Sequence, residues 1–310
     1  MKLACWNFYE DGVTQSLIGR WLTCRQKCSI GLLEQLTPKT DRTPLAFGQL
    51  VHRVLEKTYR AGNPDHIGSV IEEVAETLRP KDPAAFEEFE LLVGWAEALL
   101  PRYFAFWGKK DFTKMQWETL EESFEMPWTL ASGNQTILRG KLDGVYRAGK
   151  GLWLMEHKTK GQIREDFLID QLGFELQCMW YLTVVREQYG ETPKGINYNI
   201  LRRPGLRRTQ KETLSAFVGR CREDILARPE HYFQRFEVAV TEAEFDRWHE
   251  EFEVILAEFE TWAEDPRLWT YRNSGACSIY GTCEFMPICS SGNRAGYEAK
   301  TSHFPELEEE

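Results

Sequence analysis

One charged segment restricts the fold more than any other feature of the chain, because Asp143, Glu156 and Lys158 stand within sixteen residues. Short apolar runs flank the turn Ala148–Gly151 between them, a pattern that predicts a β-hairpin. If the two central turn residues form the loop, Asp143 lies opposite Glu156; a longer loop would shift this register. Opposed carboxylates repel each other in water, so the segment predicts a cation between them. Glu156 and Lys158 are two residues apart and therefore project from one strand face.

The residue types at this site favour a hard divalent ion. Mg²⁺ or Mn²⁺ binds a few carboxylates and leaves its remaining positions to water and substrate phosphate. Such an ion acidifies an attacking water and offsets charge on the phosphate, and Lys158 is expected to orient that water or to stabilise the same charge. The structural alternative is a solvent-facing hairpin with ordinary surface charges, because the spacing alone is only moderately specific.

Two further motifs flank the hairpin in the sequence. His52 lies upstream in the segment 47–55, and Gln177 and Tyr181 follow downstream, four residues apart and thus on one helix face. In this order, the motifs resemble those of the RecB-like branch of the PD-(D/E)XK nuclease superfamily, which includes the CRISPR adaptation nucleases and many phage-encoded exonucleases. The resemblance implies metal ligands at His52, Asp143 and Glu156, and catalytic roles for Asp143, Glu156, Lys158, Gln177 and Tyr181.

Each flanking motif also has a structural interpretation. A histidine among apolar residues, such as His52, is commonly a helix residue with a local hydrogen bond. A pair such as Gln177 and Tyr181 commonly borders a hydrophobic core. His157 departs from the family pattern, which more often has an apolar or aromatic residue between the Glu and the Lys. Strand alternation places His157 on the opposite face, where we expect it to pack or to hydrogen-bond.

Cysteine spacing gives a second signal. Cys277, Cys283 and Cys289 follow one another at regular intervals, and a site with four thiolates needs one more ligand. The resemblance implies that Cys24 is this ligand and that the four hold a [4Fe-4S] cluster, with Cys28 as the rival. Zn²⁺ also takes four thiolates, so the spacing leaves both metals open. A cluster would tie the two ends of the chain together as a structural clasp.

Disulfides are the remaining interpretation of the eight cysteines, but no secretory signal is visible before the sequence turns acidic at Glu10. We therefore expect a cytoplasmic protein of a bacterial cell, encoded by host or phage, with Cys5, Cys178 and Cys221 as buried thiols. No apolar run approaches the length of a membrane span.

The formal net charge of -10 is unevenly distributed. Acidic residues concentrate in 87–90, 242–260 and 306–310, whereas a basic cluster follows the predicted strand 196–201. Phosphate contacts need only local positive potential, so DNA is the expected partner of this cluster; the alternative is a solvated loop. The cluster consists of Arg202, Arg203, Arg207, Arg208 and Lys211.

The order of expected elements predicts an α/β fold, which the resemblance makes a restriction-endonuclease-like mixed central sheet flanked by helices. A helical N-terminal region (1–115) carries Cys24 and His52, and a nuclease core (116–241) follows. A C-terminal helix and iron-sulfur segment (242–289) precede an acidic tail (290–310) that is expected to be disordered. The core is expected to contain strands 122–130, 196–201 and 236–240 and helices 167–189 and 212–226.

Together these features predict a metal-dependent deoxyribonuclease, specifically an exonuclease for single strands or DNA ends in recombination or repair. The sequence contains no Gly-x4-Gly-Lys-Ser/Thr phosphate loop, so a helicase or recombination partner is expected to supply any motor. The alternatives are a nucleic-acid-binding or adaptor subunit with little activity and a cluster-bearing redox sensor. Cleavage polarity, DNA against RNA, exonuclease against endonuclease and oligomeric state remain open.

Overall fold

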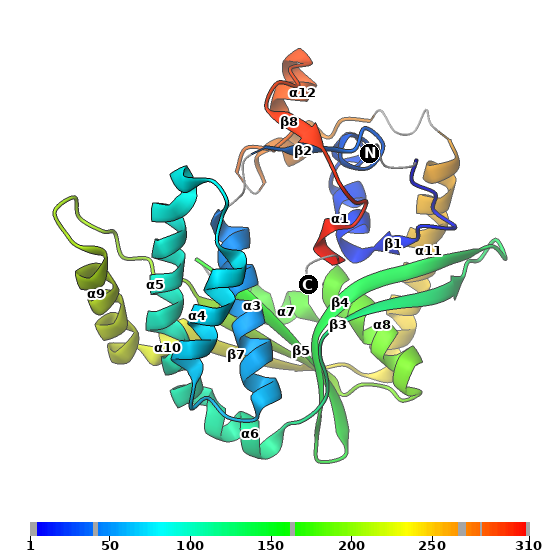
Figure 1. Cartoon of the computed structure of the whole chain (residues 1–310). Helices are drawn as coiled ribbons and strands as arrows, with labels where there is room; N and C mark the ends of the chain where they lie inside the picture. The colour runs from blue at the N-terminus through cyan, green and yellow to red at the C-terminus, as the bar shows by residue number, and fades with distance from the viewer. Residues whose placement is uncertain (1–4, 40–42, 162–164, 266–270, 280, 308–310) are drawn as a thin grey trace.

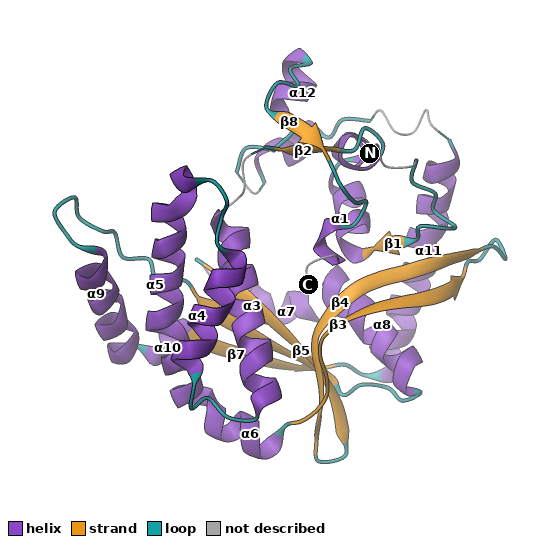
Figure 2. Cartoon of the chain, in the orientation of Figure 1, coloured by secondary structure: helices purple, strands orange, loops and turns teal. Residues whose placement is uncertain are grey.

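A mixed six-stranded sheet forms the centre of the molecule, and helices cover it (Figures 1 and 2). The structure is a computed structural model that describes residues 5–39, 43–161, 165–265, 271–279 and 281–307. Its strands run in the order β1-β4-β5-β6-β7, with β3 paired to β4. They are β1 (Val13–Thr14), β3 (Gln116–Thr129), β4 (Gln135–Ala148), β5 (Gly151–Lys160), β6 (Gly195–Arg202) and β7 (Phe233–Ala239).

The long strand β4 organises this sheet. β3 pairs antiparallel with β4 along nearly its whole length, so the other partners of β4 share its second edge. On that edge β1 is parallel to Leu138–Arg139, whereas β5 is antiparallel to residues 144–148. The stretch between these two contacts, residues 140–143, contains Asp143. β5 and β6 are parallel, and β6 and β7 are antiparallel.

Two hydrophobic cores lie on the two faces of the sheet. The first is formed mainly by α1 (Gln15–Thr23), α8 (Leu176–Tyr189) and α11 (Glu242–Glu264). The second is formed by α3 (Thr43–Ala61), α4 (Ile67–Leu78), α5 (Phe86–Tyr103) and α9 (Leu214–Ala227). Along β6, Ile196 and Ile200 face the first core, so the buried Asn197 and Asn199 face the opposite side. Two helical layers around a mixed sheet confirm the predicted α/β class and the helical N-terminal region.

The predicted hairpin register is confirmed. Gly144 pairs with Met155 and Ala148 pairs with Gly151, as a two-residue loop requires. Gly149 has a φ of +61°, which glycine adopts without strain. The strand expected at 122–130 begins earlier, at Gln116.

The helix expected over 167–189 is wrong as a single element. It is divided into α7 (Glu165–Leu172) and α8, with Gly173 between them. The side chain of Glu175 accepts a hydrogen bond from the backbone N–H of Cys178 at 2.8 Å and caps α8. The chain therefore begins a new helix here. The other α-helices of the described residues are α2 (Arg25–Leu32), α6 (Lys109–Lys114), α10 (Pro229–Tyr232) and α12 (Met286–Ser291).

The C-terminal segment also differs from the prediction of disorder. β8 (Tyr297–Ala299) pairs antiparallel with β2 (Leu36–Pro38) as a separate two-stranded sheet. The Tyr297 ring packs against Phe285, and Phe304 is buried against the first core. Apolar burial within the described part of this segment explains its order. Among the described helices, none combines the length and the apolar character needed to cross a membrane.

Candidate active site

A cavity of about 360 Å³ opens beside the stretch 140–143 of β4. α3 contacts both β3 and β5 and supplies one wall, and α8 supplies another. Because the edge of β4 is divided between β1 and β5, the polar side chains of the hairpin reach this cavity. All six predicted catalytic and metal-binding residues line it: His52, Asp143, Glu156, Lys158, Gln177 and Tyr181.

Three side chains form a compact set of metal-ligand atoms. His52 Nδ1 lies 3.1 Å from Glu121 Oε1 and 3.3 Å from Asp143 Oδ1. One donor atom from each of the three residues lies within 4.8 Å of the others. Imidazole nitrogen and carboxylate oxygens suit Mn²⁺ or Mg²⁺.

Glu121 was not predicted from the sequence. The pairs Leu120–Gly144 and Glu122–Leu142 place it opposite Asp143, on the side of β4 away from β5. Its φ of +46° lies in the left-handed region, which is uncommon for a residue other than glycine. The expected strand began one residue after Glu121, and the pairing that brings Glu121 to Asp143 was not predicted.

Glu156 and Lys158 form the second part of the site. Glu156 is fully buried, and its Oε1 accepts a hydrogen bond from Lys158 Nζ. Lys158 Nζ also donates to Gln177 Oε1 at 2.8 Å. Among the described residues, Glu156 Oε2 has no hydrogen-bond partner. A buried carboxylate oxygen without a partner is costly, so its environment fits a bound cation.

The pKa shifts have a common origin in three converging carboxylates. Burial, with the charge of Asp143, raises the pKa of Glu156 to about 8. Burial opposes the charged form of His52, but Asp143 and Glu121 raise its pKa well above the ordinary value. Burial likewise disfavours the Lys158 ammonium, and Glu156 outweighs this and raises the Lys158 pKa. Positive charge is therefore strongly favoured here, as a metal site requires.

Two residues of α8 complete the cavity. Gln177 holds Lys158, while the nearly buried ring of Tyr181 lies against Gly140. A Cβ atom at Gly140 would approach Tyr181 Cε1 to 3.0 Å and Phe124 Cζ to 2.5 Å. Glycine at this position lets both aromatic rings lie next to the strand.

The predicted basic cluster lies elsewhere, since none of its five residues lines the cavity. The Arg203 guanidinium lies over the Trp95 ring, 5.2 Å from its centroid, and Arg208 hydrogen-bonds the backbone oxygen of Glu212. The basic residues that do line the cavity, besides Lys158, are Arg53 and Lys141. Lys141 lies 3.0 Å from Glu121.

The predicted cluster cysteines come close together at the C-terminal end of α1. Cys24, Cys277 and Cys283 line a small cavity of about 50 Å³. Burial raises the pKa of Cys289, and nearby Cys24, Cys283 and Cys277 add to the shift. Within the described residues, no three cysteine sulfurs lie within 4.8 Å of one another.

The other four cysteines lie outside this group. Cys28 is fully buried in the first core, and burial raises its pKa to about 12. Cys178 and Cys221 are buried as predicted. The same prediction is wrong for Cys5, which is exposed.

A mixed sheet with carboxylates, a histidine and a lysine at one interrupted edge defines a candidate metal site on a nuclease-like fold. The chain belongs to the PD-(D/E)XK nuclease superfamily, whose family model matches residues 13–290. None of the curated proteins matches the chain.

Two solved structures are similar over most of their length. One is the crystal structure of a candidate exonuclease from Eubacterium rectale, with 14% identity and a TM-score of 0.45 over 90% of this chain and 91% of that chain. The other is the crystal structure of SSO0001, with 12% identity and a TM-score of 0.31 over 90% of this chain and 96% of that chain.

Below about pH 6.5 the lowered pKa of buried His157 opposes the effect of Glu156, so the stability of the metal-free protein is expected to fall as pH rises from about 6.5 to about 8. Folded Glu156 keeps its proton up to about pH 8, whereas an unfolded carboxyl releases it near 4.5, so the folded state binds more protons in this window. The raised pKa of His52 acts in the same direction above its ordinary value of 6.5. Thermal melts at both ends of the window measure the effect. Glu156→Gln should reduce the slope, and an unchanged slope in that variant would contradict the assignment.

Proposed function

We propose that the chain is a Mg²⁺- or Mn²⁺-dependent deoxyribonuclease of the RecB-like branch of its superfamily. The observation that carries the proposal is the convergence of His52, Glu121 and Asp143 beside the partnerless Oε2 of Glu156, with Lys158 next to it. An ion at this place would be held by these four side chains, and it would supply Lewis-acid stabilisation of the phosphate and a more acidic water.

The protein groups around this site have distinct tasks. Lys158 keeps its proton and is held by Glu156 and Gln177, so its ammonium is preorganised to stabilise negative charge on a phosphate oxygen. The Tyr181 ring lies where it can help to position the nucleic-acid strand along the cavity. The proposed substrate is a single DNA strand or a DNA end, which the helical region around α3 would guide to the site.

The basic cluster is proposed to contact the DNA backbone beyond the cavity. The backbone N–H of Arg203 donates to Lys160 O at 2.9 Å, so Arg203 lies at the end of the strand that carries Lys158. Arg202 is its neighbour in the chain, and Arg207, Arg208 and Lys211 follow within nine residues. A helicase or recombination protein is the proposed source of any unwinding.

We also propose a [4Fe-4S] cluster held by Cys24, Cys277, Cys283 and Cys289. Cys24, Cys277 and Cys283 line one small cavity, and burial and the same three cysteines raise the pKa of nearby Cys289. The burial of Cys28 in the first core favours Cys24 over Cys28. Zn²⁺ bound by the same four thiolates is the alternative.

The experiment that tests the nuclease proposal uses protein purified without oxygen. It is incubated with end-labelled single- and double-stranded DNA, and with RNA, in the presence of Mn²⁺ or of a chelator. We expect Mn²⁺-dependent degradation of DNA, and the ladder of products gives polarity and end preference. Folded, cluster-loaded protein that binds Mn²⁺ but leaves every substrate intact would instead favour the adaptor alternative.

Replacing Glu121 by Gln is expected to weaken Mn²⁺ binding at least about tenfold, because it removes one anionic ligand from the set. Titration calorimetry of the variant measures the change. The matched control is Glu122→Gln, since the Glu122 side chain hydrogen-bonds Thr119 and does not line the cavity. Equal Mn²⁺ affinities for the two variants would show that Glu121 is not a ligand.

A further inference from the structure

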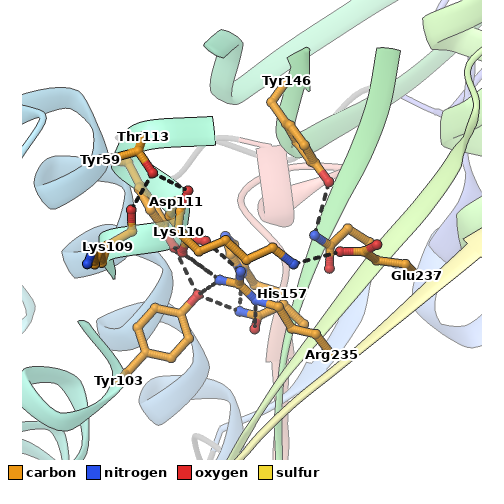
Figure 3. Close-up of polar contacts among 12 residues, drawn as sticks. Tyr59, Tyr103, Lys109, Lys110, Asp111, Thr113, Tyr146, His157, Arg235 and Glu237 are labelled. Carbon is orange, nitrogen blue, oxygen red and sulfur yellow. Dashed lines mark hydrogen bonds and ion pairs between the residues drawn. The ribbon is translucent and has the colours of Figure 1, made fainter. Parts of the chain in front are cut away.

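A buried polar network on the second face of the sheet joins Tyr59, Tyr103, Asp111, His157 and Arg235 (Figure 3). Arg235 of β7 donates to both carboxylate oxygens of Asp111, at 2.6 and 2.7 Å. The side chains of this ion pair are only 2% and 0% exposed. Arg235 Nη2 also donates to the hydroxyl of Tyr103 at 2.6 Å, and Tyr59 donates to Asp111 Oδ2 at 2.7 Å.

The donors of this network fix the orientation of one amide. Arg235 Nε donates to Asn199 Oδ1 at 2.9 Å. Because a guanidinium has no acceptor, the oxygen of Asn199 must face Arg235, and its nitrogen must face the other way. That nitrogen donates to Tyr103 at 3.0 Å and lies 2.7 Å from Nδ1 of His157. His157 Nδ1 is therefore an acceptor, and the proton of its neutral ring is on Nε2.

The same network is connected to the metal-ligand residues. The backbone N–H of His157 donates to Asp143 Oδ2 at 2.6 Å, so His157 holds the proposed metal ligand Asp143 in place. The His157 ring is stacked with that of Tyr59, at a centroid distance of 6.2 Å. Tyr59 is seven residues after His52 on α3, two turns along the helix, and therefore on the same face.

We infer that Asn199 is a positioning residue for the metal site: oriented by the Arg235–Asp111 ion pair, it fixes the ring of His157 and with it the N–H that holds Asp143. This inference rests on the proposed function, since it concerns the same site. Hydrogen bonds to ligating carboxylates set ligand geometry, and their loss typically lowers metal affinity about 10- to 100-fold.

The test is an isosteric change, Asn199→Asp, in the full chain. One carboxylate oxygen still accepts from Arg235, while the other now faces His157 Nδ1 and demands a donor there. We expect ¹⁵N NMR of the histidine side chains to show Nε2–H for His157 in the wild type and Nδ1–H in the variant. We expect calorimetry to show Mn²⁺ affinity lowered at least about tenfold.

The matched control is Asn197→Asp, two residues away on the same strand face. Asn197 is equally buried and donates to Tyr146 at 3.0 Å, and among the described residues no hydrogen bond joins its side chain to His157. The Asn197→Asp variant should keep the wild-type His157 tautomer and nearly the wild-type Mn²⁺ affinity. Melting temperatures are recorded for both variants.

Three results would overturn the inference. The first is an Nδ1–H tautomer of His157 in the wild type, a result that does not depend on any variant folding. The second is a changed His157 tautomer in Asn199→Asp with unchanged Mn²⁺ affinity. The third is a loss of Mn²⁺ affinity in Asn197→Asp equal to that in Asn199→Asp. If the tautomers and Mn²⁺ affinities are as expected but the wild-type protein leaves DNA intact, the positioning role of Asn199 is supported and the nuclease proposal is not. Failure of the inference and failure of the nuclease proposal are therefore distinguishable.

Discussion

Replacement of Lys158 by Ala is expected to lower the rate of DNA cleavage about 10²- to 10³-fold, the usual effect of removing one preorganised donor from a developing anion. The side chain ends at Glu156 and Gln177 inside the cavity, so the variant loses the only ammonium that contacts Glu156 among the described residues. Cleavage of end-labelled DNA in Mn²⁺ measures the loss, and a melting curve confirms that the variant is folded.

Lys160→Ala is the matched control for this prediction. Lys160 is two residues further on the same face of β5, but its ammonium lies over the Tyr198 ring, 5.1 Å from the centroid, and does not line the cavity. It should cleave at nearly the wild-type rate. Cleavage by Lys158→Ala at the wild-type rate would mean that the activity comes from another site or another protein.

Replacement of Cys24 by Ser is expected to abolish iron binding, from about four irons per chain to nearly none, and to lower the stability of the C-terminal segment. The thiolate of Cys24 is the proposed link between α1 and the segment that carries Cys277 and Cys283. Iron and sulfide content, the visible chromophore and the melting temperature of protein purified without oxygen report on the same event.

Cys28→Ala is the control that decides between the two candidate ligands. Its thiol lies in the first hydrophobic core, so its loss should cost only about 1 kcal/mol as a small cavity and should leave iron content unchanged. Iron retained by Cys24→Ser and lost by Cys28→Ala would reverse the assignment. Zinc instead of iron in freshly purified protein would show that the cysteines form a structural zinc site and not an iron-sulfur cluster.

The sequence alone was sufficient to predict the β-hairpin, because the residues that determine a hairpin are close together in the chain. A glycine turn and two apolar runs favour a two-residue loop, and the register that this loop requires is observed from Gly144–Met155 to Ala148–Gly151. Side-chain alternation then placed Glu156 and Lys158 on the face towards α8, and His157 on the face towards α3. The break at Gly173 was missed because the apolar pattern continues across it.

Other features depend on tertiary structure. Glu121 joins the site through a left-handed φ in β3 and pairing with a distant part of β4, neither of which alternation reveals. The basic residues after β6 were identified by charge density alone, which locates positive residues but does not show whether they line the cavity. The network of Asn199 and Arg235 joins residues from helices and strands spread over most of the chain.

The pairing of β2 with β8 also sets the order in which the molecule can be assembled. Residues 36–38 leave the ribosome well before their partners, residues 297–299, which follow some 260 residues later. Cys283, Cys289 and Tyr297 pack against the small core around Ile30, so Cys24 cannot be enclosed with its proposed partners until residue 297 has been synthesised. Closing so long a loop is slow. Because Leu307 lines the candidate active-site cavity and Phe304 is buried in the first core, that cavity and the proposed cluster site would both be completed late in biogenesis.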